Sequence, residues 1–270
     1  MNLKVGLFCL LGGLCFTLPA LGVGNFGWWW LSGVVTAAAL VPVVRFGPRH
    51  EAAQCGAIFL VLVVVGLGCT LSEAVLFYPA MKGQMTASAA GGTVGYLLAA
   101  ALLTALAKAL KLHDAEAAAV EHRPAAWAIP LVLAAGASYV VYYEIFGAIT
   151  YQFFTKGYYP QAVEQVMAMG MWFFAYQWAR GLLMTLAVLP VIYTLRLPRW
   201  QAALAVGLLV WVVGGAGPLL VPNGMMGTAQ RFIHIVEIMT QNVSLGMTAV
   251  WLLRSRTAPS AAGMQAVTTA

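Results

Sequence analysis

The chain has 270 residues, of which 62% are hydrophobic and only 8% are charged. A soluble globular domain carries about 25% charged residues, so this composition excludes such a domain and indicates a protein that folds among membrane lipids. The net charge of +6 comes from cations scattered at the ends of apolar segments rather than from a basic cluster. That distribution argues against a nucleic-acid partner.

Apolar stretches of about 20 residues, the length that crosses a bilayer, predict an all-α, polytopic transmembrane helix bundle with about eight spans. In chain order the predicted spans are Leu3–Leu21, Trp28–Phe46, Cys55–Tyr78, Thr93–Leu112, Ala126–Ala148, Met171–Leu195, Trp200–Val221 and Ala229–Leu253. We expect a single transmembrane domain over residues 1–256 and a flexible cytoplasmic tail over 257–270. The first span resembles a signal peptide, but no A-x-A site follows it, so we expect it to remain as a helix.

Cationic residues predict the orientation of the spans, because cytoplasmic loops are enriched in Lys and Arg. Ten cations fall on one side, and only Lys82 and Lys156 fall on the other. The ten are Lys4, Arg45, Arg49, Lys108, Lys111, Arg123, Arg196, Arg199, Arg254 and Arg256. We therefore expect both termini to be cytoplasmic, in a bacterial-type inner (plasma) membrane. The outer loop 151–170 contains a mildly amphipathic stretch, which is expected to lie along the interface or to form a lid.

Ionisable residues within the spans are the first candidates for function. Each costs at least about 2.5 to 3.5 kcal/mol near the bilayer centre on insertion scales, so their retention suggests use. The predicted orientation places all of them in the outer half of the membrane. They are Glu73, Glu144, Arg180, Arg231, His234 and Glu237. Apolar composition does not require this shared depth, so we interpret these residues as a substrate or proton site.

The last span carries a polar stripe. At 100° per residue, its polar side chains fall within an arc of about 140°. They are Arg231, His234, Glu237, Gln241 and Asn242. Such a stripe must face protein or water rather than lipid. A network that only holds helices together is the alternative to a functional site.

Two acids and one arginine on other spans extend the candidate site. Glu73 and Glu144 lie at similar depth on two outward-running spans, through either a duplicated hairpin or coincidence, and the following spans show no identity that supports duplication. The planar guanidinium of Arg180 suits a carboxylate or phosphate, whether of a substrate or of a neighbouring Glu. Pro190 and the run Gly214–Pro218 weaken helical hydrogen bonding, where a bend or an unwound turn is expected.

No particular cofactor or oligomeric state is indicated. Only His234 among the histidines is embedded, which excludes a bis-His haem, and the last span has no lysine for a retinal Schiff base. A metal held by His234, Glu237, Glu73 and Cys69 is chemically feasible, but one histidine with carboxylates is a weak pattern, and we expect no metal site. The four cysteines lie in apolar runs without CxxC spacing, so no disulfide framework is implied.

Three functions fit these observations. The leading hypothesis is a transporter for a small solute, with an anionic solute and proton linkage as options. The alternative is an intramembrane enzyme that acts on a lipid or lipid-linked substrate from the outer leaflet. In that enzyme Glu237 or Glu144 would be the general base, with His234 as acid or base and with Arg180 and Arg231 holding a phosphate. The third is a non-catalytic membrane subunit.

Overall fold

The structure is a computed structural model that describes residues 3–21, 24–78, 82–114 and 123–255. Every regular element in these residues is helical, which confirms the all-α prediction. The predicted tail 257–270 lies outside the described residues. Long apolar runs form helices because a backbone in lipid must satisfy its hydrogen bonds within its own segment.

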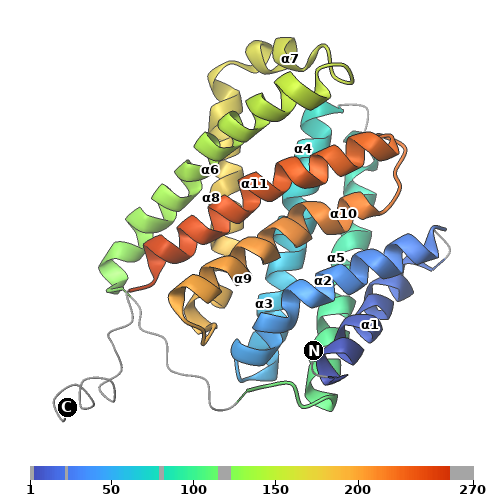
Figure 1. The fold of residues 1–270 in the computed structure, drawn as a ribbon, viewed down its shortest axis with the longest axis vertical. Helices are drawn as coiled ribbons and strands as arrows, with labels where there is room; N and C mark the ends of the chain where they lie inside the picture. Colours follow the sequence, from blue (N-terminus) through green and yellow to red (C-terminus); the bar gives the residue numbers. More distant parts are fainter. Residues whose placement is uncertain (1–2, 22–23, 79–81, 115–122, 256–270) are drawn as a thin grey trace, which may run out of the picture.

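Helices of three kinds build the bundle (Figure 1). The α-helices are α1 (Leu3–Thr17), α2 (Phe26–Phe46), α3 (Glu51–Val61), α4 (Thr70–Phe77), α5 (Lys82–Ala109), α6 (Ala128–Thr150), α7 (Ala162–Met169), α8 (Met171–Thr194), α9 (Arg199–Trp211), α10 (Gly217–Leu220) and α11 (Thr228–Leu253). Three stretches are wound as π-helix, namely Leu62–Cys69, Tyr151–Thr155 and Val212–Ala216. Short 3-10 turns occupy Leu18–Ala20 and Ala125–Trp127.

Two of the π-helical stretches join the α-helices on either side of them, and the third, Tyr151–Thr155, extends α6 at its end. Six continuous helices are therefore long and apolar enough to cross a membrane. They are Phe26–Phe46, Glu51–Phe77, Lys82–Ala109, Ala128–Thr155, Met171–Thr194 and Arg199–Leu220. We write α3–α4 for the continuous helix that includes the π-helical segment Leu62–Cys69, and α9–α10 for the one that includes Val212–Ala216. Each of these, like each single long helix, is called a rod.

The first and last long helices lie outside this set of six. α1 has 15 residues and packs on α2 and α5, whereas α11 has 26 residues, carries the polar stripe and packs on α6 and α9. One predicted boundary is wrong: the span expected to begin at Thr93 begins at Lys82. The intervening residues are small and polar, so they lack an apolar signal yet still continue the helix.

The packing of the first four rods repeats in the last four. We call α1, α2, α3–α4 and α5 unit 1, and α6, α8, α9–α10 and α11 unit 2. In unit 1 the first helix packs on the second and fourth, and the third on the fourth; unit 2 shows the same pairs. Between the units, α3–α4 packs on α8, α9–α10 packs on α2, and the two π-helical segments pack on each other. α7 stands outside this pattern.

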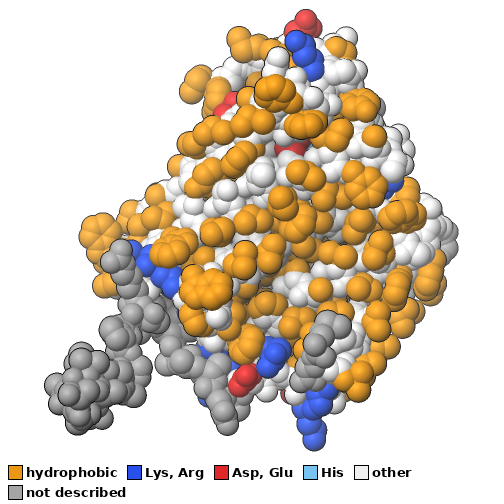
Figure 2. Space-filling view, in the orientation of Figure 1, with side chains coloured by type: hydrophobic (Ala, Val, Ile, Leu, Met, Phe, Trp, Pro, Cys, Tyr) orange, Lys and Arg blue, Asp and Glu red, His pale blue; other side chains and the backbone are white. Residues whose placement is uncertain are grey.

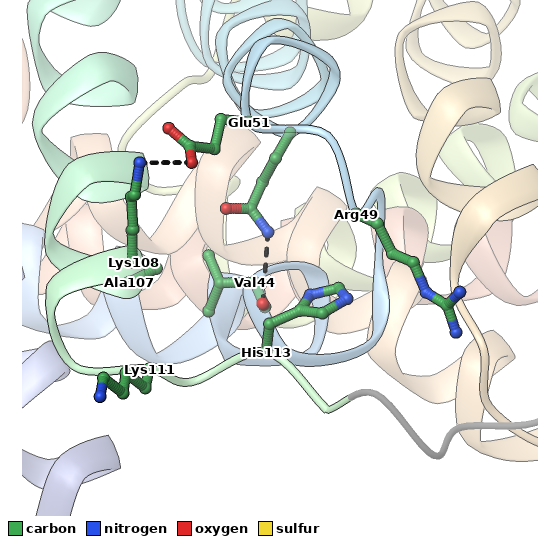
Figure 3. Close-up of a pocket in the computed structure, with 8 residues that line it drawn as sticks. Val44, Arg49, Glu51, Ala107, Lys108, Lys111 and His113 are labelled. Atoms are coloured by element: carbon green, nitrogen blue, oxygen red, sulfur yellow. Dashed lines mark hydrogen bonds and ion pairs between the residues drawn. The ribbon is translucent and has the colours of Figure 1, made fainter.

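Cationic side chains gather at one end of the bundle (Figure 2). There Lys108 forms an ion pair with Glu51 at 2.7 Å. The same two residues line a shallow pocket of about 250 Å³ beside Arg49, Lys111 and His113 (Figure 3). Charged side chains at the end of a bundle of apolar helices are typical of a membrane–water interface.

His113 at this end gives a pH prediction. Burial lowers the pKa of His113 from its ordinary value of 6.5, and the nearby charge of Arg196 lowers it further. Arg196 also donates a hydrogen bond to His113 Nε2 at 2.9 Å, which requires an unprotonated acceptor. The unfolded chain therefore binds this proton more readily than the folded chain, and stability falls as the pH drops through about 6.5.

Thermal unfolding in detergent at pH 7.5 and pH 5 measures this effect. We expect His113→Gln to lose less stability on acidification than the wild type does. His50→Gln, at the same end of the bundle, is the matched control and should keep the wild-type response. An equal response to pH in wild type and His113→Gln would contradict the prediction.

Candidate functional site

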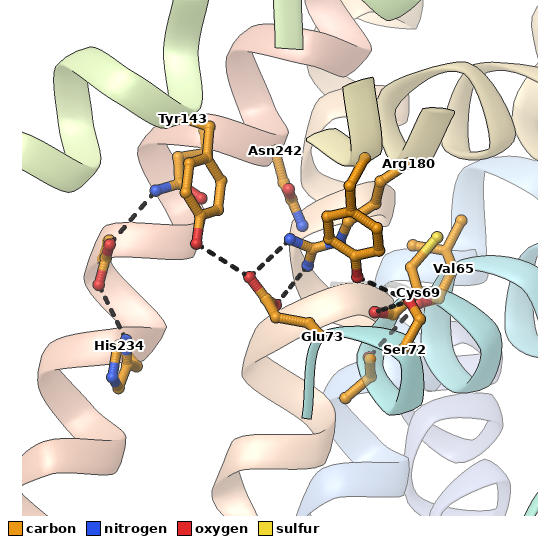
Figure 4. A network of polar contacts seen from close by, with 12 residues as sticks. Val65, Cys69, Ser72, Glu73, Tyr143, Arg180, His234 and Asn242 are labelled. Atoms are coloured by element: carbon orange, nitrogen blue, oxygen red, sulfur yellow. Dashed lines mark hydrogen bonds and ion pairs between the residues drawn. The ribbon is translucent and has the colours of Figure 1, made fainter. Parts of the chain in front are cut away.

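A buried ion pair between the two units is the centre of the candidate site (Figure 4). Arg180 Nη1 lies 2.7 Å from Glu73 Oε1, and Arg180 Nη2 lies 2.6 Å from Glu73 Oε2. The Arg180 side chain is 3% exposed and that of Glu73 is 23% exposed. Two parallel charge-assisted bonds of this kind are strong and specific in direction. Each charge is compensated by the other, since either one alone would be costly at this depth.

The chain before Glu73 explains how its carboxylate reaches α8. Glu73 lies in the first turn of α4, directly after the π-helical segment Leu62–Cys69. A π-helical stretch changes the face on which later residues lie and is frequent at functional sites. Ser72 Oγ, beside Glu73, lies 2.9 Å from the hydroxyl of Tyr176 on α8. This second polar contact holds α4 against α8.

Two tyrosines of α6 enclose the ion pair. Tyr143 donates its hydroxyl hydrogen bond to Glu73 Oε1 at 3.2 Å. The Tyr139 ring lies 5.5 Å from Arg180 Cζ, within range of a cation–π interaction. Neither tyrosine was among the site residues that we expected from the sequence. Their spacing of four residues, which places both on one helix face, was the available signal.

A second polar pair lies on α11. His234 Nδ1 is 2.8 Å from Glu237 Oε2, and Gln241 donates to Glu237 Oε1 at 3.4 Å. The side chains of His234 and Glu237 are 21% and 13% exposed. Tyr159, from the loop that precedes α7, lies with its ring 5.6 Å from the His234 ring. This loop therefore contacts the imidazole.

One face of α6 links the two pairs. Gly147 lies one turn after Tyr143, and a Cβ atom at Gly147 would be 3.6 Å from Glu237 Oε1. Glu73 and Glu237 therefore both approach this face of α6, one turn apart. In the view of Figure 4, Tyr143 stands between Glu73 and His234.

The other expected residues are placed elsewhere. Arg231 donates to the carbonyl oxygens of the last two residues of α10, both at 3.0 Å, rather than to an acid. Asn242 is fully buried and donates to the carbonyl of Val210 at 3.2 Å. The Oε1 atom of Glu144 is buried without a hydrogen-bond partner among the described residues. The structure thus brings four of the eight expected residues into two neighbouring pairs, with Gln241 bonded to one of them, and leaves these three outside.

Further buried polar atoms lie on the residues around the ion pair. Gln177, one turn before Arg180, is 0% exposed, and neither of its amide atoms has a partner among the described residues. The same holds for the Tyr139 hydroxyl and for Arg180 Nε. Because buried polar groups normally form hydrogen bonds, these atoms are available to water or to a polar ligand.

The residues considered for a metal do not assemble. Across the four described ranges, no group of three or more His, Cys, Asp or Glu is close enough to hold an ion. Glu73 pairs with Arg180, whereas His234 pairs with Glu237. The Cys69 thiol lies beside Arg180 rather than beside the imidazole (Figure 4).

Comparison of the chain with protein-family models, with curated proteins and with solved structures finds no match. The fold and the site define a class of protein by themselves. It is an all-helical protein with six helices fit to cross a membrane and a buried ion pair that joins two four-helix units.

Proposed function

We propose that the protein is a proton-linked transporter of a small anionic solute, with eight spans and both termini in the cytoplasm. The observation that carries the proposal is the buried ion pair between Arg180 and Glu73, which joins the two units. Anionic solutes are recognised by planar, bidentate guanidinium contacts of this kind. A bacterial-type plasma membrane fits the biased distribution of cations.

Support for eight spans comes from the two helices outside the set of six. α1 is the counterpart of α6 in the packing of the two units, and α11 is the counterpart of α5. Both α6 and α5 belong to the set of six. α11 turns Arg231, Gln241 and Asn242 inward, where they are buried, and exposes Phe232 and Val236. A helix of this kind can cross a membrane beside its neighbours despite its polar residues.

The contacts suggest a sequence of binding and proton transfer. A carboxylate or phosphate group of the solute takes the two Arg180 donors that Glu73 now occupies. The displaced Glu73 carboxylate accepts one proton, so a monovalent anion and one proton enter the site without adding net charge. His234 and Glu237 lie toward the outer loop and supply the proton, and Tyr143 is placed to pass it to Glu73.

Uptake into proteoliposomes tests this proposal. Purified protein is reconstituted with a pH-sensitive dye inside, and acetate, lactate, succinate and inorganic phosphate are added in turn outside. We expect at least one anion to acidify the lumen, and Glu237→Gln to slow this by at least about tenfold because the proton supply is lost. Tyr142→Phe is the control, since Tyr142 bonds Thr248 at 2.7 Å, away from both pairs. Equal rates in Glu237→Gln and the control would overturn proton linkage.

The His234–Glu237 pair favours a second candidate, an intramembrane enzyme that acts on a lipid or lipid-linked substrate from the outer leaflet. An imidazole held by a carboxylate is a common general base, and both side chains are partly exposed. Mass spectrometry of lipids incubated with the protein in nanodiscs tests this candidate. It predicts a product that the Glu237→Gln variant does not form.

A further inference from the structure

We infer that units 1 and 2 are copies of one four-helix unit related by a pseudo-twofold axis along the membrane normal. We further propose that the Arg180–Glu73 ion pair is the latch between their outer ends, released when an anion takes Arg180. The latch rests on the proposed function for its ligand. Parallel repeats of this kind occur in transporters, where one unit moves against the other around a fixed site.

The first two helices of each unit cross at equivalent glycines. In unit 1, a Cβ atom added to Gly33 of the second helix would lie 2.8 Å from the oxygen of Gly13 and 2.9 Å from Cβ of Phe16 on the first helix. In unit 2, a Cβ atom added to Gly181 of the second helix would lie 2.5 Å from the oxygen of Gly136 and 2.5 Å from Cβ of Tyr139 on the first helix. In both units the aromatic residue follows the first-helix glycine by three positions.

The two π-helical segments make a reciprocal contact. A Cβ atom at Gly66 would lie 3.0 Å from Val213 Cγ1 and 3.3 Å from the Val213 oxygen. A Cβ atom at Gly214 would lie 2.9 Å from Val65 Cγ1 and 3.8 Å from the Val65 oxygen. The two Val-Gly dipeptides are 148 residues apart, and so are Gly33 and Gly181. Reciprocity of this kind is the signature of a twofold axis.

The fourth helices obey the same relation. The Cβ position of Gly66 is 3.4 Å from the hydroxyl of Tyr96 on α5, and that of Gly214 is 3.0 Å from Nδ2 of Asn242 on α11. Each of these polar groups therefore approaches the π-helical segment of its own unit at the same point. All four helices of the two units are thus matched. The glycine crossing matches the first and second helices, the Val-Gly contacts match the third, and Tyr96 and Asn242 match the fourth.

An insertion hides the repeat in the sequence. The first helices are 123 residues apart, but the second and third helices are 148 apart, so unit 2 contains 25 additional residues between its first two helices. That insertion is the outer loop with α7. Glu73 lies on the third helix of unit 1 and Glu144 on the first helix of unit 2, so their similar depth does not come from a duplicated hairpin.

The latch occupies a position that is equivalent in the two units. Ser32 of α2 donates to the Gly217 oxygen of unit 2 at 2.7 Å. At the offset of 148 residues, Arg180 is equivalent to Ser32, and Cys69 is equivalent to Gly217. Arg180 lies beside Cys69 and forms its ion pair with Glu73. One inter-unit contact is therefore a neutral hydrogen bond, and its counterpart has become an ion pair that an anion can open.

The contact between the π-helical segments can serve as the pivot. It is formed by valine side chains against glycine, so a small shift in this contact slides one apolar surface over another. The outer contacts, in contrast, are directional bonds of Glu73 to Arg180 and Tyr143. Loss of the ion pair should therefore separate the outer ends of the units while the pivot stays closed.

Cys69 is a natural reporter for this movement, because it is 3% exposed and lies at the latch. The full chain with Cys9, Cys15 and Cys55 replaced by alanine keeps Cys69 as its single thiol. Right-side-out vesicles are labelled with a membrane-impermeant maleimide. We expect Glu73→Gln to be labelled at least about tenfold faster than the parent, and Tyr142→Phe, which breaks a bond within unit 2, to be unchanged.

The exchanged pair Glu73→Arg with Arg180→Glu separates a latch from general damage to the fold. It should restore slow labelling, because the ion pair is rebuilt in the opposite direction.

Acetate and inorganic phosphate, used as probes on the parent, should speed labelling if an anion takes Arg180. Equal labelling of Glu73→Gln and Tyr142→Phe would overturn the latch, even if proteoliposomes transport protons. Rapid labelling of Glu73→Gln without any anion-driven proton uptake would instead overturn the proposed function and keep the latch.

Discussion

Replacing Arg180 by Met is expected to cost about 3 to 5 kcal/mol of stability, because the Glu73 carboxylate then lacks its counter-charge in a low-dielectric site. Glu73→Gln is expected to lower the free energy of unfolding by a similar amount, since the Arg180 side chain is 3% exposed and its guanidinium then lacks a counter-charge. Together, Arg180→Met and Glu73→Gln should cost much less than the sum. Equilibrium unfolding in mixed micelles measures all four members of this cycle.

Arg231→Met is the comparison for this cycle. Arg231 is as buried as Arg180, but its hydrogen-bond partners within the described part of the chain are backbone carbonyls and a hydroxyl. Its effect on stability should therefore simply add to that of Glu73→Gln. Additive effects of Arg180 and Glu73 would show that the ion pair does not contribute as a unit and would remove the basis of the latch.

Gly181→Ala is expected to disrupt the packing of α8 on α6. The added Cβ would lie 2.5 Å from the Gly136 oxygen and 2.5 Å from Tyr139 Cβ, and neither atom belongs to a flexible side-chain end. The two helices must separate, which typically costs 1 to 3 kcal/mol or more in an overpacked core. Because Tyr139 lies against Arg180, we also expect faster labelling of Cys69.

Gly91→Ala is the matched control, since a Cβ at Gly91 in α5 meets nothing within 4 Å. Removing a glycine from a helix stabilises it by up to about 1 kcal/mol. The two alanine variants should therefore change the unfolding temperature in opposite directions. A loss of stability in both would mean that the close contact at the α6–α8 crossing is not what decides the response to Gly181→Ala.

The candidate site shows where inference from sequence ends. The helical spacing of His234, Glu237 and Gln241 predicted that these residues share a face, because contacts between residues three or four apart follow from helix geometry. The pairing of Glu73 with Arg180 joins residues 107 apart, and no local rule specifies it. The sequence suggested that Arg180 binds a carboxylate or phosphate, of a substrate or of a neighbouring Glu, but it did not indicate which Glu.

The sequence by itself determined that the chain is helical, apolar and polarised in charge, since these properties depend on composition and on short-range spacing. It also predicted most helix ends within a few residues, as at Met171 and Leu253. Only the tertiary structure decided which buried charges meet, that Arg231 binds carbonyls, and that the two units pack in the same way. The physical reason is that each of these outcomes depends on how helices distant in the chain pack, and reciprocal glycine contacts such as Gly66 with Val213 leave almost no trace in residue identity.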